Sequence, residues 1–268
     1  MTHVLGIIAA TGFVVLCTLL PFLPGGHDSL AVPLSAMAQV FGFTGLLLVP
    51  AGGLWMASVH WSRLAGWRYA FAVVAFVTAS IVWLTVSVAA LFSGAAFAFC
   101  TAALGVYIGW RVWPRLRTLS NAAPIYLLVV PVVVVSLQRA MADPVTELAR
   151  SRAIRNSAPL IADIEQYHVT YGRYPTSLTS VSKDYLPSVV GVEEYQYEPS
   201  GDTYNLFFEQ FTFSPDVRQI VMYNPRDQQE MTSHDIDLLR RPEELQWRRG
   251  YHSVRDTAHP HWKCFDFD

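Results

Sequence analysis

The sequence predicts a membrane α-helical bundle of five spans in residues 1–138, followed in residues 139–268 by an α+β domain whose long helix packs on an antiparallel sheet. Apolar segments recur from residue 4 to residue 137, and the chain then turns polar at Arg139 and stays so to its end. Within the polar part, a helical hydrophobic stripe gives way to alternating apolar and polar residues. The chain therefore combines a part suited to lipid with a part suited to water.

Five apolar runs are long enough to cross a bilayer, which requires about 20 apolar residues with a range of about 17–25. They lie at about residues 4–23, 32–58, 69–92, 96–113 and 122–138. The fifth run is the shortest and contains Pro124 and Pro131, but its core is apolar throughout. The first run lacks a basic leading region, and Pro24-Gly25-Gly26 fits a cleavage site poorly, so we interpret this run as an uncleaved span.

Charge separates the two parts of the chain. Residues 1–137 hold five arginines, one acid and no lysine, a formal sum of +4, whereas residues 138–268 hold 14 basic and 20 acidic residues, a sum of −6. The acidic balance of the polar part argues against a nucleic-acid partner. The predicted spans contain no Asp, Glu or Lys at mid-depth, which counts against a pump or a small-solute transporter.

The arginines of the membrane part also predict its orientation. They fall in two loops that are two spans apart, with Arg63 and Arg68 in one and Arg111, Arg115 and Arg117 in the other. Because positive residues of short loops stay on the cytoplasmic side, we expect a cytoplasmic amino terminus and an extracytoplasmic domain at 139–268. The tryptophans flanking those loops suit the same interface, namely Trp61, Trp67, Trp110 and Trp113.

The polar part should begin with a long helix. Asp143-Pro144 can cap and start it, Pro159 should bend or divide it, and Gly172 is a natural stop. An apolar stripe at helical spacing is formed by Leu160, Ile164, Tyr167 and Tyr171, with Ile161 and His168 beside them. This stripe is expected to cover one face of a sheet.

Beyond the helix the pattern becomes that of antiparallel strands. Tyr195–Glu198 and Thr203–Phe208 alternate around the turn residues Pro199–Asp202, which predicts a hairpin. Ser214–Asp216 is a second turn, and it leads into the apolar run Val217–Tyr223. A helix followed by such a meander gives an α+β domain.

Part of the polar domain resembles type IV pilin-like proteins, especially the major pseudopilins of type II secretion. The matching segments, within about residues 145–210, are Ile161–Tyr167, then Tyr171-Gly172-Arg173-Tyr174-Pro175 through Leu178, and Tyr185–Pro187. The resemblance implies a helix that leads through a loop to an antiparallel sheet, with the Tyr171–Pro175 motif in a structural turn. It also implies a bacterial inner-membrane protein with a periplasmic domain.

The departures from that family concern processing. Family members carry one amino-terminal helix, which is released after a Gly and bears an early Glu. Here Gly42-Phe43-Thr44 lies inside the second predicted span, and Leu47 stands where the Glu would be. We therefore expect a pilin-like head that is not processed or polymerised, fixed on a five-span anchor whose fifth span replaces the usual stem.

A cluster near the carboxyl terminus offers metal-ligand chemistry. Imidazole and thiolate groups bind transition metals, and the candidate ligands are His252, His259, His261 and Cys264, with Asp266 and Asp268 nearby. The alternative, which we favour, is a terminal strand that packs Trp262, Phe265 and Phe267 inward and buries Cys264. Pairing of Cys264 with another chain is also open.

The other polar groups of the domain have simpler interpretations. His168 is interpreted as a packed or surface-edge histidine, and His234–Asp237 as a capped helix start. Arg240-Arg241 and Arg248-Arg249 enclose Glu243 and Glu244, and we interpret them as solvated surface.

The sequence favours a noncatalytic integral membrane protein. We expect its pilin-like extracytoplasmic domain to bind another membrane or envelope protein in a secretion or pilus-like assembly. No cofactor is expected. Membrane lipid should contact the predicted spans, and the small residues in these spans permit an oligomer. The alternatives are a membrane-bound enzyme with a metal at the carboxyl-terminal histidines and, behind it, a small-solute transporter.

Overall fold

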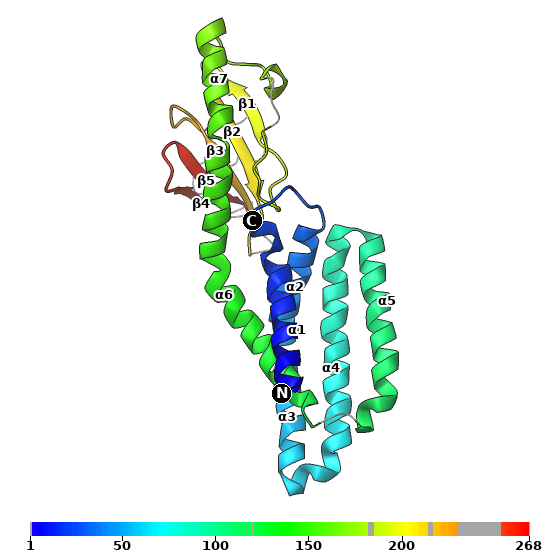
Figure 1. The fold of residues 1–268 in the computed structure, drawn as a ribbon. Helices are drawn as coiled ribbons and strands as arrows, with labels where there is room; N and C mark the ends of the chain where they lie inside the picture. The colour runs from blue at the N-terminus through cyan, green and yellow to red at the C-terminus, as the bar shows by residue number, and fades with distance from the viewer. Residues whose placement is uncertain (1, 119–120, 182–184, 214–216, 230–252, 268) are drawn as a thin grey trace, which may run out of the picture. The chain divides into compact units, whose positions relative to one another are not determined.

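The computed structural model describes residues 2–118, 121–181, 185–213, 217–229 and 253–267 (Figure 1). The chain divides into two compact units: unit 1 is Met1–Leu20 with Leu30–Ala142, and unit 2 is Pro21–Ser29 with Asp143–Asp268. Unit 2 thus begins a few residues after the predicted boundary and includes a loop from the amino-terminal part. That loop belongs there because Phe22 is buried in the core of unit 2.

Unit 1 consists of α-helices, in which α1 packs on α2, α2 and α3 pack on α4, and α4 packs on α5 (Figure 1). The helices are α1 (Thr2–Leu19), α2 (Ala31–Gly45), α3 (Leu48–His60), α4 (Arg68–Ala89), α5 (Ala95–Val112) and the first part of α6 (Ala123–Asn156). Short 3₁₀ helices accompany them, namely η2 (Ser62–Trp67), η3 (Ala90–Ser93) and η4 (Trp113–Thr118), whereas η1 (Leu20–Phe22) leads from α1 into unit 2.

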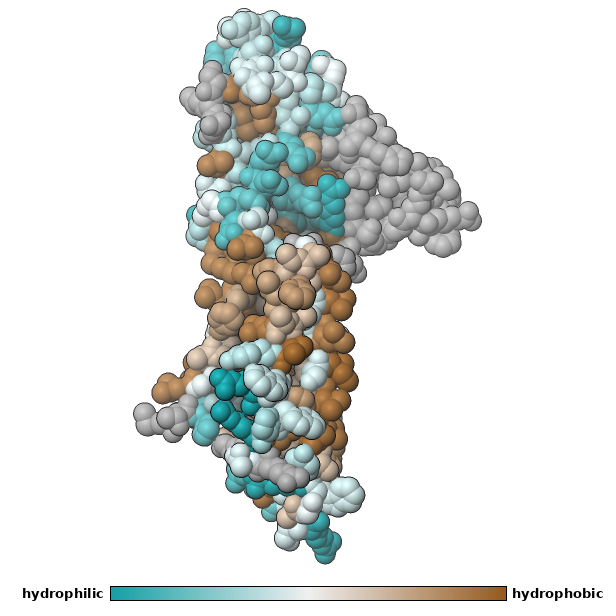
Figure 2. Space-filling view, turned by 90° about the vertical axis from the view of Figure 1, so that its right-hand side faces the viewer, coloured by the Kyte–Doolittle hydropathy of each residue, from teal (hydrophilic) through white to brown (hydrophobic). Residues whose placement is uncertain are grey.

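These helices have the length and composition of membrane spans. In the described part of the chain, four helical segments qualify, or five if the bent pair α2–α3 counts as one span. Many large apolar side chains of unit 1 are exposed, such as Phe99 at 75% and Phe13 at 68%. Figure 2 shows the resulting apolar surface over this unit, which is what a lipid-facing helix requires.

The second predicted span, 32–58, is broken rather than continuous. Helices α2 and α3 meet at an angle of 50°. Pro50 stands in the first turn of α3 and has no N–H to donate to the carbonyl of Leu46, so Val49 N donates to that carbonyl instead, at 3.1 Å. The break therefore follows from a proline that the sequence already showed.

Small side chains allow the helices of unit 1 to approach closely, as the sequence predicted. Ala51, Ala72 and Ala75 are buried together with Trp55 between α3 and α4. A Cβ added at Gly52 would lie 3.0 Å from the Cβ of Leu127, so α3 and α6 are in contact at this glycine.

A network of uncharged polar groups lies inside unit 1. Gln138 Nε2 of α6 donates to Thr18 Oγ1 of α1 and to the carbonyl of Ala38 of α2, each at 3.2 Å. Gln39 Nε2 donates to Ser35 Oγ at 3.3 Å, and Ser35 Oγ donates to the Thr18 carbonyl at 2.6 Å. Both glutamines are buried, so these bonds tie α1, α2 and α6 together away from water.

The helical part of unit 2 is the end of α6 followed by α7 (Ala158–Tyr171). Ser157 alone separates the end of α6 from the start of α7, and Pro159 is the second residue of α7. The predicted division of the helix at this proline is therefore confirmed. The prediction that Asp143-Pro144 starts a helix is wrong, because both residues lie within α6. A helix already formed upstream continues through one lost backbone hydrogen bond.

The strands of unit 2 form one antiparallel sheet in the order β1-β2-β3-β5-β4. They are β1 (Gln196–Ser200), β2 (Thr203–Gln210), β3 (Arg218–Tyr223), β4 (Ser253–Asp256) and β5 (Trp262–Phe267), preceded by η5 (Leu178–Ser180). The predicted hairpin is confirmed, with Ser200 opposite Thr203 and Gly201 at φ +60° in the turn. The predicted α+β class is confirmed with it.

Helices α6 and α7 cover one face of this sheet (Figure 1). Their buried residues, Ala149, Ala153, Ile154, Leu160 and Ile164, pack with Tyr204, Leu206, Phe208, Val221 and Trp262 of the strands. The predicted stripe is buried only in its first half, since Tyr171 is 64% exposed. The stripe leaves the core there because the helix runs past the packed strands.

The loop Pro21–Ser29 is anchored in unit 2 by stacking and backbone bonds. The ring of Phe22 stacks on that of Phe213, with centroids 4.8 Å apart and planes at 4°. Pro24 forms a β-bridge with Val189, and Gly25 N donates to the Ser188 carbonyl at 3.2 Å. The segment after α1 is thus an integral part of the carboxyl-terminal unit.

Candidate functional site

The two described histidines of the predicted metal cluster have different partners. His259 and His261 both lie in the turn between β4 and β5. His259 Nε2 is 3.2 Å from Ser151 Oγ of α6, whereas His261 Nδ1 is 3.2 Å from Asp227 Oδ2. The turn therefore directs one imidazole toward the helix and the other toward the segment after β3.

The metal hypothesis stays a prediction. Among the described residues, no group of three or more His, Cys, Asp or Glu side chains is placed to hold a metal ion. His252 and Asp268 lie outside the described residues, as do His234–Asp237 and the arginine pairs at 240–241 and 248–249.

Cys264 is buried in the terminal strand, as the sequence favoured. It is 1% exposed on β5, between Val221 of β3 and Arg255 of β4. Burial raises the pKa of its thiol to about 11, although the charge of Arg150 opposes the shift. At neutral pH this cysteine is a protonated core side chain, which is a poor state for metal binding or nucleophilic attack.

A buried charge network beside Cys264 was missed in the sequence. Arg150 of α6 is 6% exposed. Its Nε donates to Gln210 Oε1 at 3.2 Å, its Nη2 donates to Gln219 Oε1 at 2.8 Å, and its Nη1 pairs with Glu147. Its helical position could have indicated this burial, because Arg150 lies four residues before the core residue Ile154, on the helix face that meets the sheet.

The network continues across the sheet to Asp266. Gln219 Nε2 donates to Asp266 Oδ1 at 2.5 Å, Ser253 Oγ donates to Oδ2 at 2.8 Å, and Arg255 Nη2 lies 2.9 Å from Oδ2. Burial alone would raise the pKa of Asp266, but these hydrogen bonds and the arginine charge hold it below its ordinary value. Asp266 is therefore an ionised link between three strands.

The Ser151–His259 contact has the wrong order of groups for nucleophilic catalysis. An activated serine requires a base that is itself oriented by a third group. Here Ser151 Oγ donates to Glu147 Oε1 at 3.4 Å and also contacts His259, so the carboxylate meets the serine rather than the imidazole. The arrangement bridges α6 to the β4–β5 turn.

The Tyr171–Pro175 motif divides into packed and exposed residues. Gly172 ends α7 in the left-handed conformation at φ +67°, and its N–H donates to the His168 carbonyl at 2.8 Å. Tyr174 stacks on His168 with centroids 4.2 Å apart, and the buried Pro175 accepts a 2.8 Å hydrogen bond from Tyr197. Tyr171 and Arg173 are exposed. The motif therefore fixes the helix end while presenting two side chains to solvent.

Glu165 anchors the tyrosines behind this motif. Tyr204 donates to Glu165 Oε1 at 3.1 Å, and Tyr174 donates to Oε2 at 3.4 Å. Burial raises the pKa of both tyrosines, and the nearby carboxylate adds to the shift. Both phenols therefore stay protonated as donors, and they connect α7 to the following loop and to β2.

No protein-family model, curated protein or solved structure matches this chain.

Proposed function

We propose that the protein is a noncatalytic, multi-pass protein of a bacterial inner membrane. Its unit 2 is a pilin-like domain on the extracytoplasmic side, where it binds another membrane or envelope protein in a secretion or pilus-like assembly. The observation that carries the proposal is the exposed surface at the end of α7, in a domain tethered to the membrane helices by two segments.

The tethers support a consistent path through the membrane. Pro21–Ser29 and Asp143 onward fold into one unit, so both lie on the same side of the bilayer. An even number of crossings must therefore separate them. The segments between them are the α2–α3 pair, α4, α5 and α6, so α2–α3 crosses once as a broken span. A re-entrant pair would leave three crossings and would put the tethers on opposite sides.

The arginines support the direction of that path. Arg63 lies in η2, Arg115 lies in η4, and the bond from Arg68 to Asn121 joins the two connections at one end of unit 1. Positive residues in short loops favour the cytoplasmic side. The opposite end, which leads to unit 2, is then extracytoplasmic.

The end of α7 has the composition of a contact surface. Val169 is 78% exposed and Tyr171 is 64% exposed, and Tyr171 lies against Tyr167 with ring centroids 4.4 Å apart. Arg173 follows the helix stop and is also exposed. Tyrosine and arginine are enriched among the residues that dominate binding energy at protein interfaces. We call Val169, Tyr171 and Arg173 the α7-end surface.

Site-specific photocrosslinking in the native membrane tests the proposal. A photoreactive residue at Val169 or Tyr171 should crosslink to an envelope protein, and Tyr171→Glu should abolish copurification of that same protein. Leu148 of α6 is the matched control, since it is a 68% exposed apolar residue of unit 2 away from this surface. Equal crosslinking from Leu148, or a partner retained by Tyr171→Glu, would remove the α7-end surface from the proposal.

A further inference from the structure

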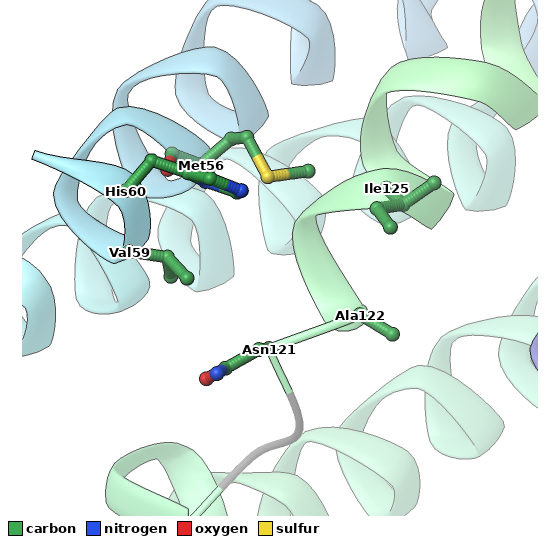
Figure 3. A pocket seen from close by; sticks show the side chains of 6 residues that line it. All are labelled: Met56, Val59, His60, Asn121, Ala122 and Ile125. Carbon is green, nitrogen blue, oxygen red and sulfur yellow. The ribbon is translucent and has the colours of Figure 1, made fainter.

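Unit 1 contains a hollow between α3 and the start of α6 (Figure 3). Its volume is about 700 Å³, and its lining residues are Met56, Val59, His60, Asn121, Ala122 and Ile125. Figure 3 shows Met56, Val59 and His60 of α3 on one side and, on the other, the segment that carries Asn121, Ala122 and Ile125. Four of the six are apolar, and the two polar ones sit at the helix ends.

The hollow lies at the level of a membrane interface. His60 is the last residue of α3, Trp61 precedes the adjoining η2 helix and Trp67 ends it, and the two tryptophans are 66% and 62% exposed. Trp110 at the end of α5 is exposed at 72%. Exposed tryptophans gather where lipid headgroups meet the hydrocarbon core. A ligand here would therefore contact headgroups on one side and acyl chains on the other.

The rim of the hollow is positively charged. Arg68 donates from Nη2 to Asn121 Oδ1, which places its guanidinium beside a lining residue. That bond occupies the amide oxygen of Asn121 and leaves its NH₂ group as a donor. His60 Nδ1 donates to the Met56 carbonyl at 3.0 Å, which leaves Nε2 of the neutral ring as an acceptor that can receive a hydrogen bond from a headgroup hydroxyl. The rim thus offers the Arg68 cation and the Asn121 amide donor to a phosphate.

Unit 1 holds no carboxylate that could balance this charge. Its residues, 1–20 and 30–142, include six arginines and no Asp, Glu or Lys. A zwitterionic headgroup would find nothing there to receive its ammonium group. A free phosphate ion would leave the apolar lining of Met56, Val59 and Ile125 uncovered.

We propose that this hollow is a binding site for an anionic phospholipid. The phosphate meets Arg68 and the Asn121 amide, and one acyl chain lies along Met56, Val59 and Ile125. Basic pockets between membrane helices on the cytoplasmic side recognise anionic headgroups by this combination of charge and shape. The inference requires insertion of unit 1 in a bilayer and is independent of any protein partner of unit 2.

Native mass spectrometry of the full chain in mild detergent tests the site. The delipidated protein is titrated with phosphatidylglycerol and with phosphatidylcholine of the same acyl chains. We expect the first phosphatidylglycerol to bind more tightly, and Arg68→Gln to weaken it about fivefold, as expected for a contribution of about 1 kcal/mol from one arginine. Val59→Trp, which fills the hollow, should abolish this first binding step.

Arg111→Gln is the matched control, because it removes one charge from the same end but on α5, where Arg111 Nε donates to Tyr107 at 3.3 Å. This variant should keep the first affinity within twofold. Equal loss in Arg68→Gln and Arg111→Gln would overturn the site in favour of diffuse charge. Equal affinity for the two lipids, or full competition by millimolar inorganic phosphate, would overturn it as well.

Discussion

The two units bury polar groups by different means. Unit 1 buries the carboxamides of Gln39 and Gln138 and has no acidic residue, whereas unit 2 buries the guanidinium of Arg150 against Gln210 and Gln219. A buried charge requires a counterion, and Glu147 provides one while its side chain stays 45% exposed. Lipid around unit 1 offers no such contact with water, so its interior relies on neutral groups.

The largest effect is expected from removing the charge in unit 2. Arg150→Met should lower the free energy of unfolding of unit 2 by about 3 kcal/mol, because Glu147 and two glutamines lose their partner. Gln138→Met in unit 1 should cost only about 1 kcal/mol, the scale of an interhelical hydrogen bond in a membrane. Hydrogen exchange by mass spectrometry of the full chain in detergent reports each unit through its own peptides.

Arg152→Met is the control, since Arg152 is an exposed arginine on the same helix. It should change exchange in unit 2 by less than about 0.5 kcal/mol. If Gln138→Met proved as costly as Arg150→Met, charge would not be what distinguishes the two interiors.

Overpacking of unit 1 should give the next largest effect. A Cβ at Gly42 would overlap the carboxamide of Gln138 and displace it from Thr18 and Ala38. Gly42→Ala should therefore cost about 2 kcal/mol. The measurement is thermal unfolding in detergent, monitored by the reaction of Cys17 on α1 with a thiol dye.

Gly53→Ala is the paired control, because a Cβ at Gly53 meets no atom within 4 Å. It should leave the midpoint of unfolding unchanged or raise it slightly. Equal losses for the two alanine variants would mean that the loss at Gly42 does not come from contact with Gln138, because the change from glycine to alanine favours the helix at both positions.

Gly172 of unit 2 acts through backbone conformation instead of packing. Gly172 has φ +67°, and a Cβ there would meet no atom within 4 Å. Gly172→Ala should cost about 1 kcal/mol from strain, and Gly172→Asn should cost less because asparagine tolerates the left-handed region. In unit 1 the order reverses, since Gly42→Asn adds more atoms against Gln138 than Gly42→Ala does. The unfolding midpoints of the four variants show whether alanine or asparagine costs more at each glycine. If the same residue cost more at Gly172 and at Gly42, the two glycines would not differ in the way proposed.

The sequence predicted the elements better than the contacts between them. Apolar length located the membrane helices, and the change of period located the α7-to-hairpin transition, because both signals are local. Pro50 and Pro144 had opposite outcomes, a broken span and an unbroken helix, because the cost of a helical proline depends on its surroundings.

The candidate sites were harder to predict for a related reason. Arg150 was missed because its partners come from strands about 60 residues away in the chain, with Gln210 the nearer of the two. Phe22 was missed because its apolar context is that of a span, whereas its stacking partner Phe213 lies in unit 2. Neither pairing leaves a periodic signal in the sequence.

The smallest effect concerns acid, to which unit 2 should respond and unit 1 should not. The lowered pKa of Asp266 means that its carboxylate stabilises unit 2 above the unfolded value of about 3.9, and that this stabilisation is lost as pH falls through the lower folded pKa. Acidification from pH 5 to below pH 3 should therefore speed exchange in β5 after correction for the intrinsic rate. The contribution should be below about 1 kcal/mol, because the Arg255 side chain is 53% exposed.

Asp266→Asn isolates this contribution from the other carboxylates of unit 2, since it should be less stable than the unmodified chain at pH 7 and equal to it near pH 2. Unit 1 has no Asp or Glu to titrate, so exchange in α4 and α5 should not change over the same range. If Asp266→Asn left the acid response of β5 intact, the network from Arg150 to Arg255 would be held by its neutral hydrogen bonds. The two interiors would then differ less than their composition indicates.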